Sequence, residues 1–398
     1  MNCTEYLQKN ALLPEQIDGP GCLKQLLTEM ELGLAGKGVI PMLPSYLSTG
    51  NSIPTRTQCC VVDAGGTNLR TALATFDAEG NCQLQGQNVI PMPGTEGELG
   101  VEELYRQIAA PLKKLGVTQR VGFCFSFNTL LERSLDGILD SWCKEVRAPE
   151  AVGQRVGASL KAQLGDPCIH VHVLNDSVAA LLWAAAMSPG IKIGLILGTG
   201  INVCYPERCA NTPKVPRDLT KESMIISTEV GEFQKIPKTT FDAQVIARSD
   251  DPATAHAEKQ CSGAYLGQLI SLAWQQAARE GLLPEVFSGA DWELSQISRY
   301  LEKPDNPTAA EIAAAMICRA AKIAAILTAG SIVRCASAGE KIGIAVEGSQ
   351  FQKLTGFREA FLRELDALLA PYGIGFEIFQ FENSCLKGAA LAAFAEPM

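Results

Sequence analysis

The chain has 398 residues, of which 47% are hydrophobic and 19% are charged, and its formal net charge is −9. An apolar content this high excludes disorder as the main state, and a chain of this length can bury a large core. The negative charge excludes a nucleic-acid binder, because that task needs a basic face. A site for a small phosphorylated ligand must therefore depend on local geometry.

Fourteen cysteines are scattered along the chain, without a CxxC pair or a cysteine–histidine cluster at zinc-site spacing. Several lie inside apolar runs, such as Cys124 in VGFCFSF, which predicts buried, reduced thiols. The first residues carry no apolar signal core, and Arg319 and Lys322 interrupt the Ala-rich stretch at 312–333. We expect a cytoplasmic protein without a membrane segment, and the oligomeric state stays open.

The first half of the chain is predicted to run β-β-β-α-β-α-β after an initial helix. Apolar runs bounded by turn residues indicate the strands, and a 3.6-residue period indicates the helices. The strands are expected at 58–64, 69–76, 82–90, 121–127 and 169–174, and the helices at about 20–36, 98–115 and 149–164.

The second half repeats this order with long helices inserted. Its strands are expected at 193–197, 201–205, 223–228, 341–346 and 374–380, and its helices at about 256–281, 288–301, 309–334, 350–370 and from 385 onward. Each half opens with a strand, a Gly/Thr turn and a second strand. The pattern predicts a duplicated α/β fold, with a ligand between its halves.

The run at 63–70 (DAGGTNLR) has the composition of a phosphate-binding turn. Its two glycines allow a tight turn close to a ligand, and successive backbone N–H groups can form an anion nest. A hairpin that merely uses glycine is the plain alternative. A second turn of the same chemistry at 198–202 (GTGIN) favours a clamp for a nucleoside triphosphate. The chain has neither a Walker loop nor a GxGxxG between a strand and a helix.

An acid follows the apolar strand in VHVLNDSVAALL (171–182). Asp or Ser at such a junction is also what a helix N-cap prefers, so a cap and a catalytic base are both open for Asp176. Both hold if Ser177 caps the helix while Asp176 faces the ligand. An ionised aspartate can accept a proton from a hydroxyl, which is the role of the carboxylate in phosphoryl transfer to an alcohol. None of the three histidines is a comparable candidate for the catalytic base, and the chain has no GxSxG motif that would indicate a serine hydrolase.

Taken in order, these and further motifs resemble the hexokinase family over about residues 20–395. The turns at 63–70 and 198–202 resemble its two phosphate motifs, and NDSV (175–178) is similar to its catalytic NDTV. Further matches are MLPSY (42–46) to MLPTF, FSFN (125–128) to FSFP, LDGIL with WCK (135–139, 142–144) to DEGIL with WTK, STEVG (227–231) to NTEWG, EK with SGAYLG (258–259, 262–267) to EK with SGxYLGE, VEGS (346–349) to the adenosine motif VDGS/T, and KGAA (387–390) to GKGAA.

The resemblance implies a ribonuclease H-like (actin-like ATPase) fold of the single-unit bacterial type. It implies transfer of the ATP γ-phosphoryl group to the 6-hydroxyl of a hexose, glucose first, with Asp176 as general base. Asp63 would hold Mg²⁺ through water. Hexose hydroxyls would contact Ser126, Lys144, Asn175, Asn202, Glu229 and Glu258. ATP would contact Asp63, Gly65, Gly66, Thr67, Asn68, Arg70, Gly198, Thr199, Gly200, Gly348 and Ser349.

The same resemblance places a small lobe at 58–190 and a large lobe at 1–57 and 191–398, and the last helix could return to the small lobe. Around the sugar the chain departs from the family pattern at Asn128, Cys143, Ser227, Val230 and Ala255, and Ser-Cys-Leu at 384–386 replaces Gly-Ser-Gly. These departures motivate a second hypothesis, a sugar sensor that has lost turnover. A third, a sugar-independent ATPase of the actin or Hsp70 type, gives no reason for the acids at 229 and 258.

Overall fold

The computed structural model describes residues 1–50, 52–142, 146–219 and 222–398. Its first sheet consists of β2 (Thr57–Ala64), β3 (Asn68–Phe76), β4 (Cys82–Pro91), β5 (Arg120–Phe125) and β8 (His170–Leu174). Their order is β4-β3-β2-β5-β8. Strands β2, β3 and β4 pair antiparallel, whereas β5 and β8 continue the sheet parallel to β2.

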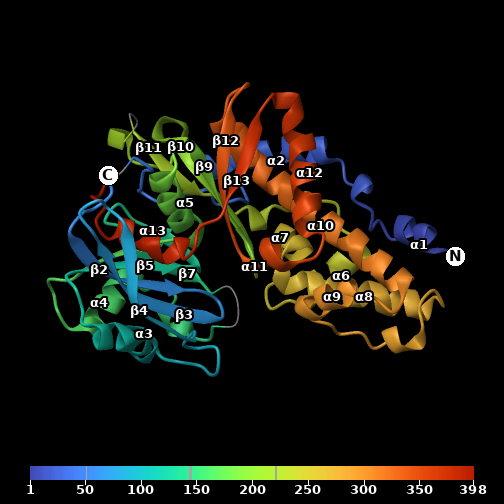
Figure 1. Cartoon of the computed structure of the whole chain (residues 1–398), viewed down its shortest axis with the longest axis horizontal. Helices are drawn as coiled ribbons and strands as arrows, with labels where there is room; N and C mark the ends of the chain where they lie inside the picture. The colour runs from blue at the N-terminus through green and yellow to red at the C-terminus, as the bar shows by residue number, and fades with distance from the viewer. Residues whose placement is uncertain (51, 143–145, 220–221) are drawn as a thin grey trace.

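The second sheet repeats this arrangement. It consists of β9 (Ile191–Leu197), β10 (Ile201–Arg208), β11 (Ser223–Ser227), β12 (Lys341–Glu347) and β13 (Gly375–Phe379), extended by β1 (Leu43–Pro44). The order β1-β11-β10-β9-β12-β13 again joins an antiparallel group of three to two parallel strands. The two sheets thus have the same topology, and the predicted duplicated α/β fold is confirmed (Figure 1).

Strand β2 is buried on both faces, which explains its continuous apolar sequence. Cys60 and Val62 pack with α3 (Val101–Leu115) and α4 (Val156–Leu164). Cys59 and Val61 pack on the opposite face, with α5 (Asp176–Met187) and α13 (Ser384–Ala392). The alternation of a strand therefore divides the core of this half into two layers.

Helices α5 and α13 lie between the two sheets, and α13, the C-terminal helix, packs on β2, β5 and α5 (Figure 1). Two glycines allow this close approach. A Cβ on Gly388 would lie 1.8 Å from the Ala179 carbonyl oxygen, and a Cβ on Gly122 would lie 1.9 Å from that of Ala389. No larger residue fits either position without separating α13 from its neighbours.

The helices that pack with the second sheet, two of them from the N-terminal end of the chain, form a layer beside it (Figure 1). They are α1 (Cys3–Lys9), α2 (Gly19–Leu34), α6 (Thr240–Arg248), α7 (His256–Cys261), α8 (Gly263–Arg279), α9 (Leu294–Glu302), α10 (Pro307–Cys335), α11 (Ser349–Lys353) and α12 (Phe357–Leu369). By length and composition α10 could cross a membrane, but 78% of its most apolar window is buried inside the protein. Its Ala-rich surface serves as the packing core of this layer.

Several predicted boundaries are wrong. The helix expected at 256–281 breaks at Ser262, whose backbone is extended, and the one expected at 350–370 breaks before Gly356, whose φ is +80°. The helix expected from 149 begins at Val156, after a 3-10 turn, and the one expected from 288 begins at Leu294. The features that were not predicted include α1, α6, the short strand β1 and the hairpin of β6 (Asn128–Leu131) and β7 (Gly137–Ser141).

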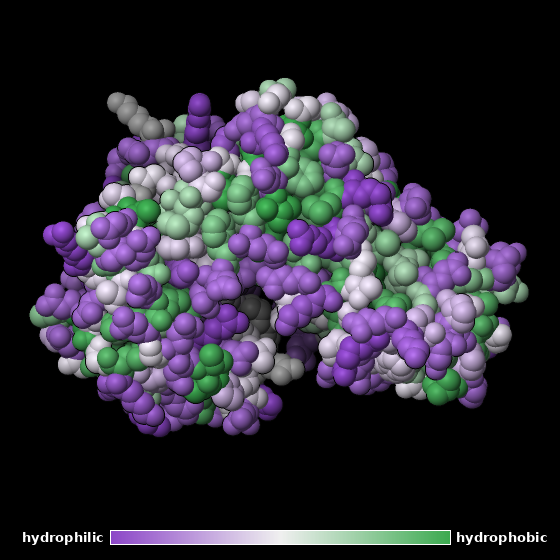
Figure 2. Space-filling view, viewed as in Figure 1, coloured by the Kyte–Doolittle hydropathy of each residue, from purple (hydrophilic) through white to green (hydrophobic). Residues whose placement is uncertain are grey.

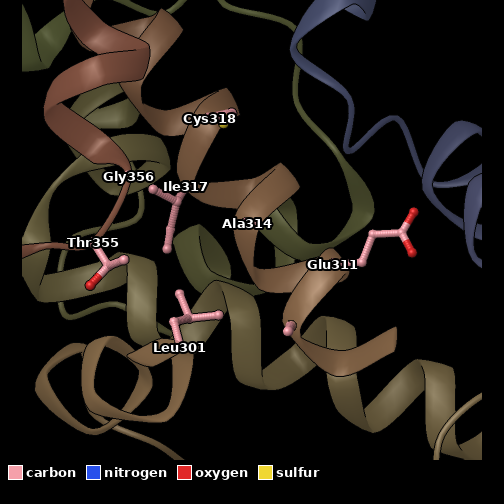
Figure 3. Close-up of a pocket in the computed structure, with 8 residues that line it drawn as sticks. Leu301, Glu311, Ala314, Ile317, Cys318, Thr355 and Gly356 are labelled. Carbon is pink, nitrogen blue, oxygen red and sulfur yellow. The ribbon is translucent and has the colours of Figure 1, made fainter. Parts of the chain in front are cut away.

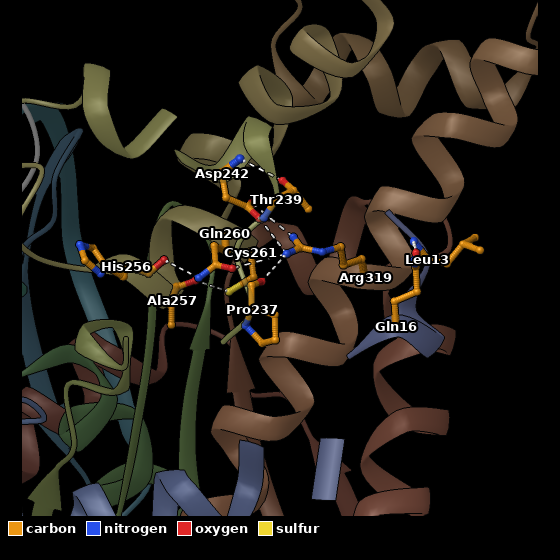
Figure 4. Close-up of polar contacts among 10 residues, drawn as sticks. All are labelled: Leu13, Gln16, Pro237, Thr239, Asp242, His256, Ala257, Gln260, Cys261 and Arg319. Carbon is orange, nitrogen blue, oxygen red and sulfur yellow. Dashed lines mark hydrogen bonds and ion pairs between the residues drawn. The ribbon is translucent and has the colours of Figure 1, made fainter. Parts of the chain in front are cut away.

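A buried ion pair joins α10 to the start of α6 (Figure 4). Arg319 and Asp242 are 4% and 1% exposed at their side chains, and Arg319 Nη2 lies 2.7 Å from Asp242 Oδ2. The same nitrogen donates to the Pro237 carbonyl at 3.0 Å and to Gln260 Oε1 on α7 at 3.5 Å. Asp242 also closes the capping box of α6 with Thr239. One guanidinium thus fixes three helices at one point.

Arg319→Met is expected to lower the free energy of unfolding by about 3–5 kcal/mol, because it leaves the Asp242 carboxylate buried without its cation. Urea-induced unfolding followed by circular dichroism measures the loss. Lys341→Met is the matched control, since Lys341 and its partner Glu377 are 64% and 56% exposed and such a pair contributes about 0–1 kcal/mol. Equal midpoints for the two variants would contradict a structural role for the Arg319 pair.

Candidate active site

Asp63 is the last residue but one of β2, at the point where the first predicted phosphate turn begins. Its carboxylate is buried, and Arg70, opposite it on β3, places Nη1 3.7 Å from Oδ2. Burial raises the pKa of Asp63 to about 6; Arg70 lowers it, and the negative charges of Glu347 and Asp176 raise it. The protein therefore compensates the negative charge of the Asp63 carboxylate only in part.

Asp176 is the first residue of α5, directly after the chain leaves β8. The N-cap is Asn175, whose Oδ1 accepts hydrogen bonds from the backbone N–H of Ser177 at 2.8 Å and from its hydroxyl at 2.7 Å. Neither of the two residues considered as a cap, Asp176 and Ser177, therefore holds the N-cap position. Asp176 Oδ1 accepts one bond, from the N–H of Ser177, and its second oxygen is available for a ligand.

A hydrogen-bonded cluster surrounds Glu229, which follows β11. Asn202 Nδ2 donates to Glu229 Oε1 at 2.7 Å and to Ser227 Oγ at 3.0 Å, and the Ser227 hydroxyl donates to the same carboxylate at 2.8 Å. Burial raises the pKa of Glu229 to about 7; the bonds from Ser227 and Asn202 lower it, and the charges of Asp176 and Glu258 raise it. Asn202 Nδ2 also reaches Asn175 Oδ1 at 3.4 Å, so the cluster extends to the start of α5.

Other predicted sugar residues lie on neighbouring elements. Glu258, on α7, accepts a hydrogen bond from the Ile201 N–H at 3.0 Å, which places it beside the second turn. Ser126 is buried just beyond β5, and its N–H donates to the Ala64 carbonyl at 3.1 Å. Lys144, together with Cys143, lies outside the described residues.

Each of the two predicted phosphate turns is closed by a backbone hydrogen bond between its own residues. In the first, the Gly65 N–H donates to the Asn68 carbonyl at 3.0 Å, and Thr67 and Asn68 are exposed. In the second, the Gly198 N–H donates to the Gly200 carbonyl at 3.0 Å, and Thr199 is exposed. Each turn connects the first and second strands of its sheet, so the duplication places them at equivalent edges.

A cavity of about 570 Å³ opens beside the second turn, here called the α9–α11 cavity. It contains three of the predicted ATP residues, Gly198, Thr199 and Ser349. None of its described lining residues comes from the first turn. Its other lining residues lie mainly on α8, α9 and α11 and were not assigned to the site. Gly263 and Ala264 belong to the SGAYLG motif, whereas the remaining residues form no local motif: Leu294, Ser295, Ser298, Arg299, Glu302, Gln350, Lys353 and Leu354.

A second groove, of about 380 Å³, lies where Leu301 of α9 approaches α10 (Figure 3). Its lining is mainly apolar, and Glu311 is its one charged residue among those described. In the space-filling view, a separate hollow bordered mainly by hydrophilic side chains opens between the first sheet and helices α8 and α9 (Figure 2). A polar, phosphorylated ligand suits the hollow and the α9–α11 cavity better than the apolar groove.

Gly348 directly follows β12 and packs against the end of β9. Its φ is +123°, and a Cβ there would lie 2.1 Å from the Leu197 carbonyl oxygen and 2.8 Å from the Gly198 nitrogen. Only glycine allows the predicted adenosine motif to lie directly against the second turn. This contact brings Ser349 to the α9–α11 cavity.

Glu347 is an acid that the motif analysis did not include among the site residues. It ends β12, and its Oε2 accepts hydrogen bonds from the Ser384 hydroxyl and, at 3.4 Å, from the Cys385 thiol, both at the start of α13. Cys385 interacts with Cys124 of β5, which in turn interacts with Asp63. Two buried thiols thus connect a carboxylate of one sheet with a carboxylate of the other. The signal was present, because Glu347 directly follows the strand expected at 341–346.

Comparison with known proteins decides the family. Two sequence models, both described as hexokinase, match residues 7–186 and residues 192–310 with 290–395. The chain belongs to the hexokinase family. The resemblance seen in its motifs is confirmed, the chain is an ATP-dependent sugar phosphotransferase, and the sugar-sensor alternative is not favoured.

Similar proteins support the family assignment over most of this chain. Hexokinase-2 of Saccharomyces cerevisiae is 27% identical over 409 residues, covering 88% of this chain and 81% of the yeast protein. Hexokinase-1 of Mus musculus is 33% identical over 273 residues, covering 62% of this chain and 27% of the mouse protein. A hexokinase from Schistosoma mansoni, complexed with glucose, has the same fold, with a TM-score of 0.83 and 24% identity over 99% of both chains.

Gly348→Ala is expected to raise KM for ATP by about tenfold, because the added methyl group separates the Ser349 turn from the second phosphate turn, at about 1–3 kcal/mol of backbone strain. Steady-state kinetics measures KM, and hexose affinity without ATP should change by less than about threefold. Gly356→Ala is the control, since Gly356 also has a positive φ, +80°, but no atom within 4 Å of its added Cβ. An equal effect of both variants on KM would contradict the contact argument.

Proposed function

We propose that this enzyme phosphorylates the 6-hydroxyl of glucose or a closely related hexose, with Asp176 as general base. One observation carries the proposal: Asp176 begins α5 directly after Asn175, whose Oδ1 accepts a hydrogen bond from Asn202 of the Glu229 cluster at 3.4 Å. The charge of Asp176 also adds to burial in raising the pKa of Asp63 and of Glu229. A single carboxylate near both the phosphate-turn acid and the Glu229 cluster suits transfer from ATP to a sugar hydroxyl. The glucose held by the Schistosoma hexokinase supports glucose as the acceptor.

The hexose would lie against the Glu229 cluster. Carboxylates accept hydrogen bonds from hydroxyls, and amides both donate and accept, so such a set recognises several hydroxyls at once. A site built this way also rejects analogues that lack a hydroxyl, because buried polar groups would then be left unpaired. We assign hexose binding to Ser126, Lys144, Asn175, Asn202, Glu229 and Glu258.

In the reaction, the Asp176 carboxylate accepts the proton of the 6-hydroxyl, and the hydroxyl oxygen forms a bond to the γ-phosphorus. The bond from that phosphorus to the β–γ bridging oxygen breaks, and ADP leaves with the electron pair. Backbone N–H groups of both turns, with Arg70, would stabilise the negative charge on the phosphates. We assign ATP binding to Asp63, Gly65, Gly66, Thr67, Asn68, Arg70, Gly198, Thr199, Gly200, Gly348 and Ser349.

Magnesium fits the donors around Asp63. Burial, together with the negative charges of Glu347 and Asp176 and against the charge of Arg70, raises the pKa of this carboxyl to about 6, so a nearby cation favours the ionised form. Within the described ranges, no three His, Cys, Asp or Glu side chains form a metal site by themselves. This agrees with Mg²⁺ held through water by one or two carboxylates and the substrate phosphates, whose charge it would neutralise.

We propose two lobes, a small one of residues 58–190 and a large one of residues 1–57 and 191–398, with α13 joined to the small lobe by its packing on β2 and β5. Closure of the lobes on the hexose would exclude water from the γ-phosphate. The proposed location is the cytoplasm, where the thirteen described cysteines, all free thiols, would stay reduced.

Asp176→Asn is expected to lower kcat by about 10²–10⁴-fold, because the amide cannot accept the hydroxyl proton. Hexose affinity should stay within about threefold, since asparagine keeps an oxygen for the Ser177 N–H. A coupled ADP assay and calorimetry measure the two quantities. Asp366→Asn, at an exposed position of α12, is the control, and turnover of Asp176→Asn at the control's rate would refute the base assignment.

Hexose affinity is expected to weaken as the pH falls from 8 to 6. The pKa of Glu229 is raised to about 7 by burial, so lowering the pH through 7 protonates the carboxylate and removes acceptors for sugar hydroxyls. Calorimetric titration across this range measures the affinity, with a midpoint near 7. Glu229→Gln should bind weakly with a flat profile. A wild-type affinity that is constant from pH 6 to 8 would contradict the assignment.

A further inference from the structure

Residues 258–264 touch both proposed ligand sites. Glu258 lies at the hexose end, where it accepts the hydrogen bond from Ile201. Five and six residues later, the N–H of Gly263 donates to the Gly198 carbonyl at 2.9 Å, and the N–H of Ala264 donates to the Thr199 carbonyl at 3.1 Å. The end of α7 and the start of α8 thus support the second phosphate turn directly.

Gln350 attaches this segment to the nucleotide side at a second point. It follows Ser349 on α11, lines the α9–α11 cavity and is 3% exposed. Its Nε2 donates to the Cys261 carbonyl at 2.7 Å, whereas its buried Oε1 has no hydrogen-bond partner among the described residues. Cys261 lies three residues after Glu258, about one helical turn along α7.

Helix α7 is held on another side as well. Gln260 accepts a hydrogen bond from Arg319 at 3.5 Å (Figure 4). Lys259 Nζ donates to the Thr254 carbonyl at 2.8 Å. A helix of six residues fixed at so many points moves as one body. A displacement of Cys261 by Gln350 therefore displaces Glu258.

We propose that Gln350 is a positioning residue that couples nucleotide binding in the α9–α11 cavity to hexose binding at Glu258. The inference rests on the proposed function for the assignment of the two sites. A nucleotide that packs against Ser349 and Gln350 fixes α11, and the Gln350–Cys261 hydrogen bond then fixes α7 in the position that presents Glu258. The second ligand meets a segment that is already ordered, so each ligand binds more tightly in the presence of the other, by the same factor.

The test measures that factor directly. Calorimetry gives the Kd of glucose with and without saturating ADP, and the Kd of ADP with and without glucose. For the wild type, both ratios should be equal and about 5-fold or more. In Gln350→Met, which keeps the length of the side chain but not its donor, both ratios should fall toward 1, while the Kd of glucose alone changes by less than about twofold. Gln352→Met is the matched control, exposed on the same short helix, and should keep the wild-type ratio.

Wild-type ratios of 1, or a wild-type ratio retained by Gln350→Met, would overturn the coupling role. If Gln350→Met does not fold, hydrogen exchange of the wild type decides: ADP alone should slow exchange of the amides at 256–264, and unchanged exchange there would overturn the inference. Failure of the proposed function would look different, as absent glucose binding by the wild type or undiminished turnover by Asp176→Asn.

Discussion

The site depends on carboxylates from both sheets meeting in one place. Asp63 is the last residue but one of β2 in the first sheet, Glu347 ends β12 in the second, and Asp176 begins α5, the helix between them. Burial, and the mutual repulsion of these acids, raises the pKa of Asp63 against the opposing charge of Arg70. Such an arrangement is unfavourable in isolation, and a bound cation would offset the repulsion between the acids.

The duplicated topology explains how the acids and turns come together. In each sheet the first and second strands are joined by a Gly-containing turn, and the fourth and fifth strands run parallel to the first. The contact of α13 with Glu347 through Ser384 and Cys385 then ties the second sheet to a helix that packs on the first. Because Gly388 allows α13 to lie directly on α5, the two connecting helices act as the common support of both halves.

The sequence correctly predicted the features that residues close together along the chain determine. The strand at 58–64 and its turn were predicted because a strand buried on both faces is apolar throughout and must end in residues that allow a sharp reversal. The local sequence allowed Asp176 to be either a helix cap or a ligand-facing acid, because Asn, Asp and Ser all suit the N-cap, and in the structure the cap is Asn175. The break at Ser262 was missed, because it is fixed by hydrogen bonds to Gly198 and Thr199, some sixty residues away. The same reason hid Gln350, whose partner is the Cys261 backbone and whose side chain belongs to no motif.

The central claim is that Asp176 lies between a hexose held by the Glu229 cluster and the terminal phosphate of ATP. A crystal structure of the enzyme with glucose, Mg²⁺ and a non-hydrolysable ATP analogue tests it most directly. The account predicts the glucose 6-hydroxyl oxygen at hydrogen-bond distance, about 2.6–3.2 Å, from the Asp176 carboxylate and pointing at the γ-phosphorus. A glucose bound away from Glu229 and Asn202, or a 6-hydroxyl that meets a different acid, would contradict it.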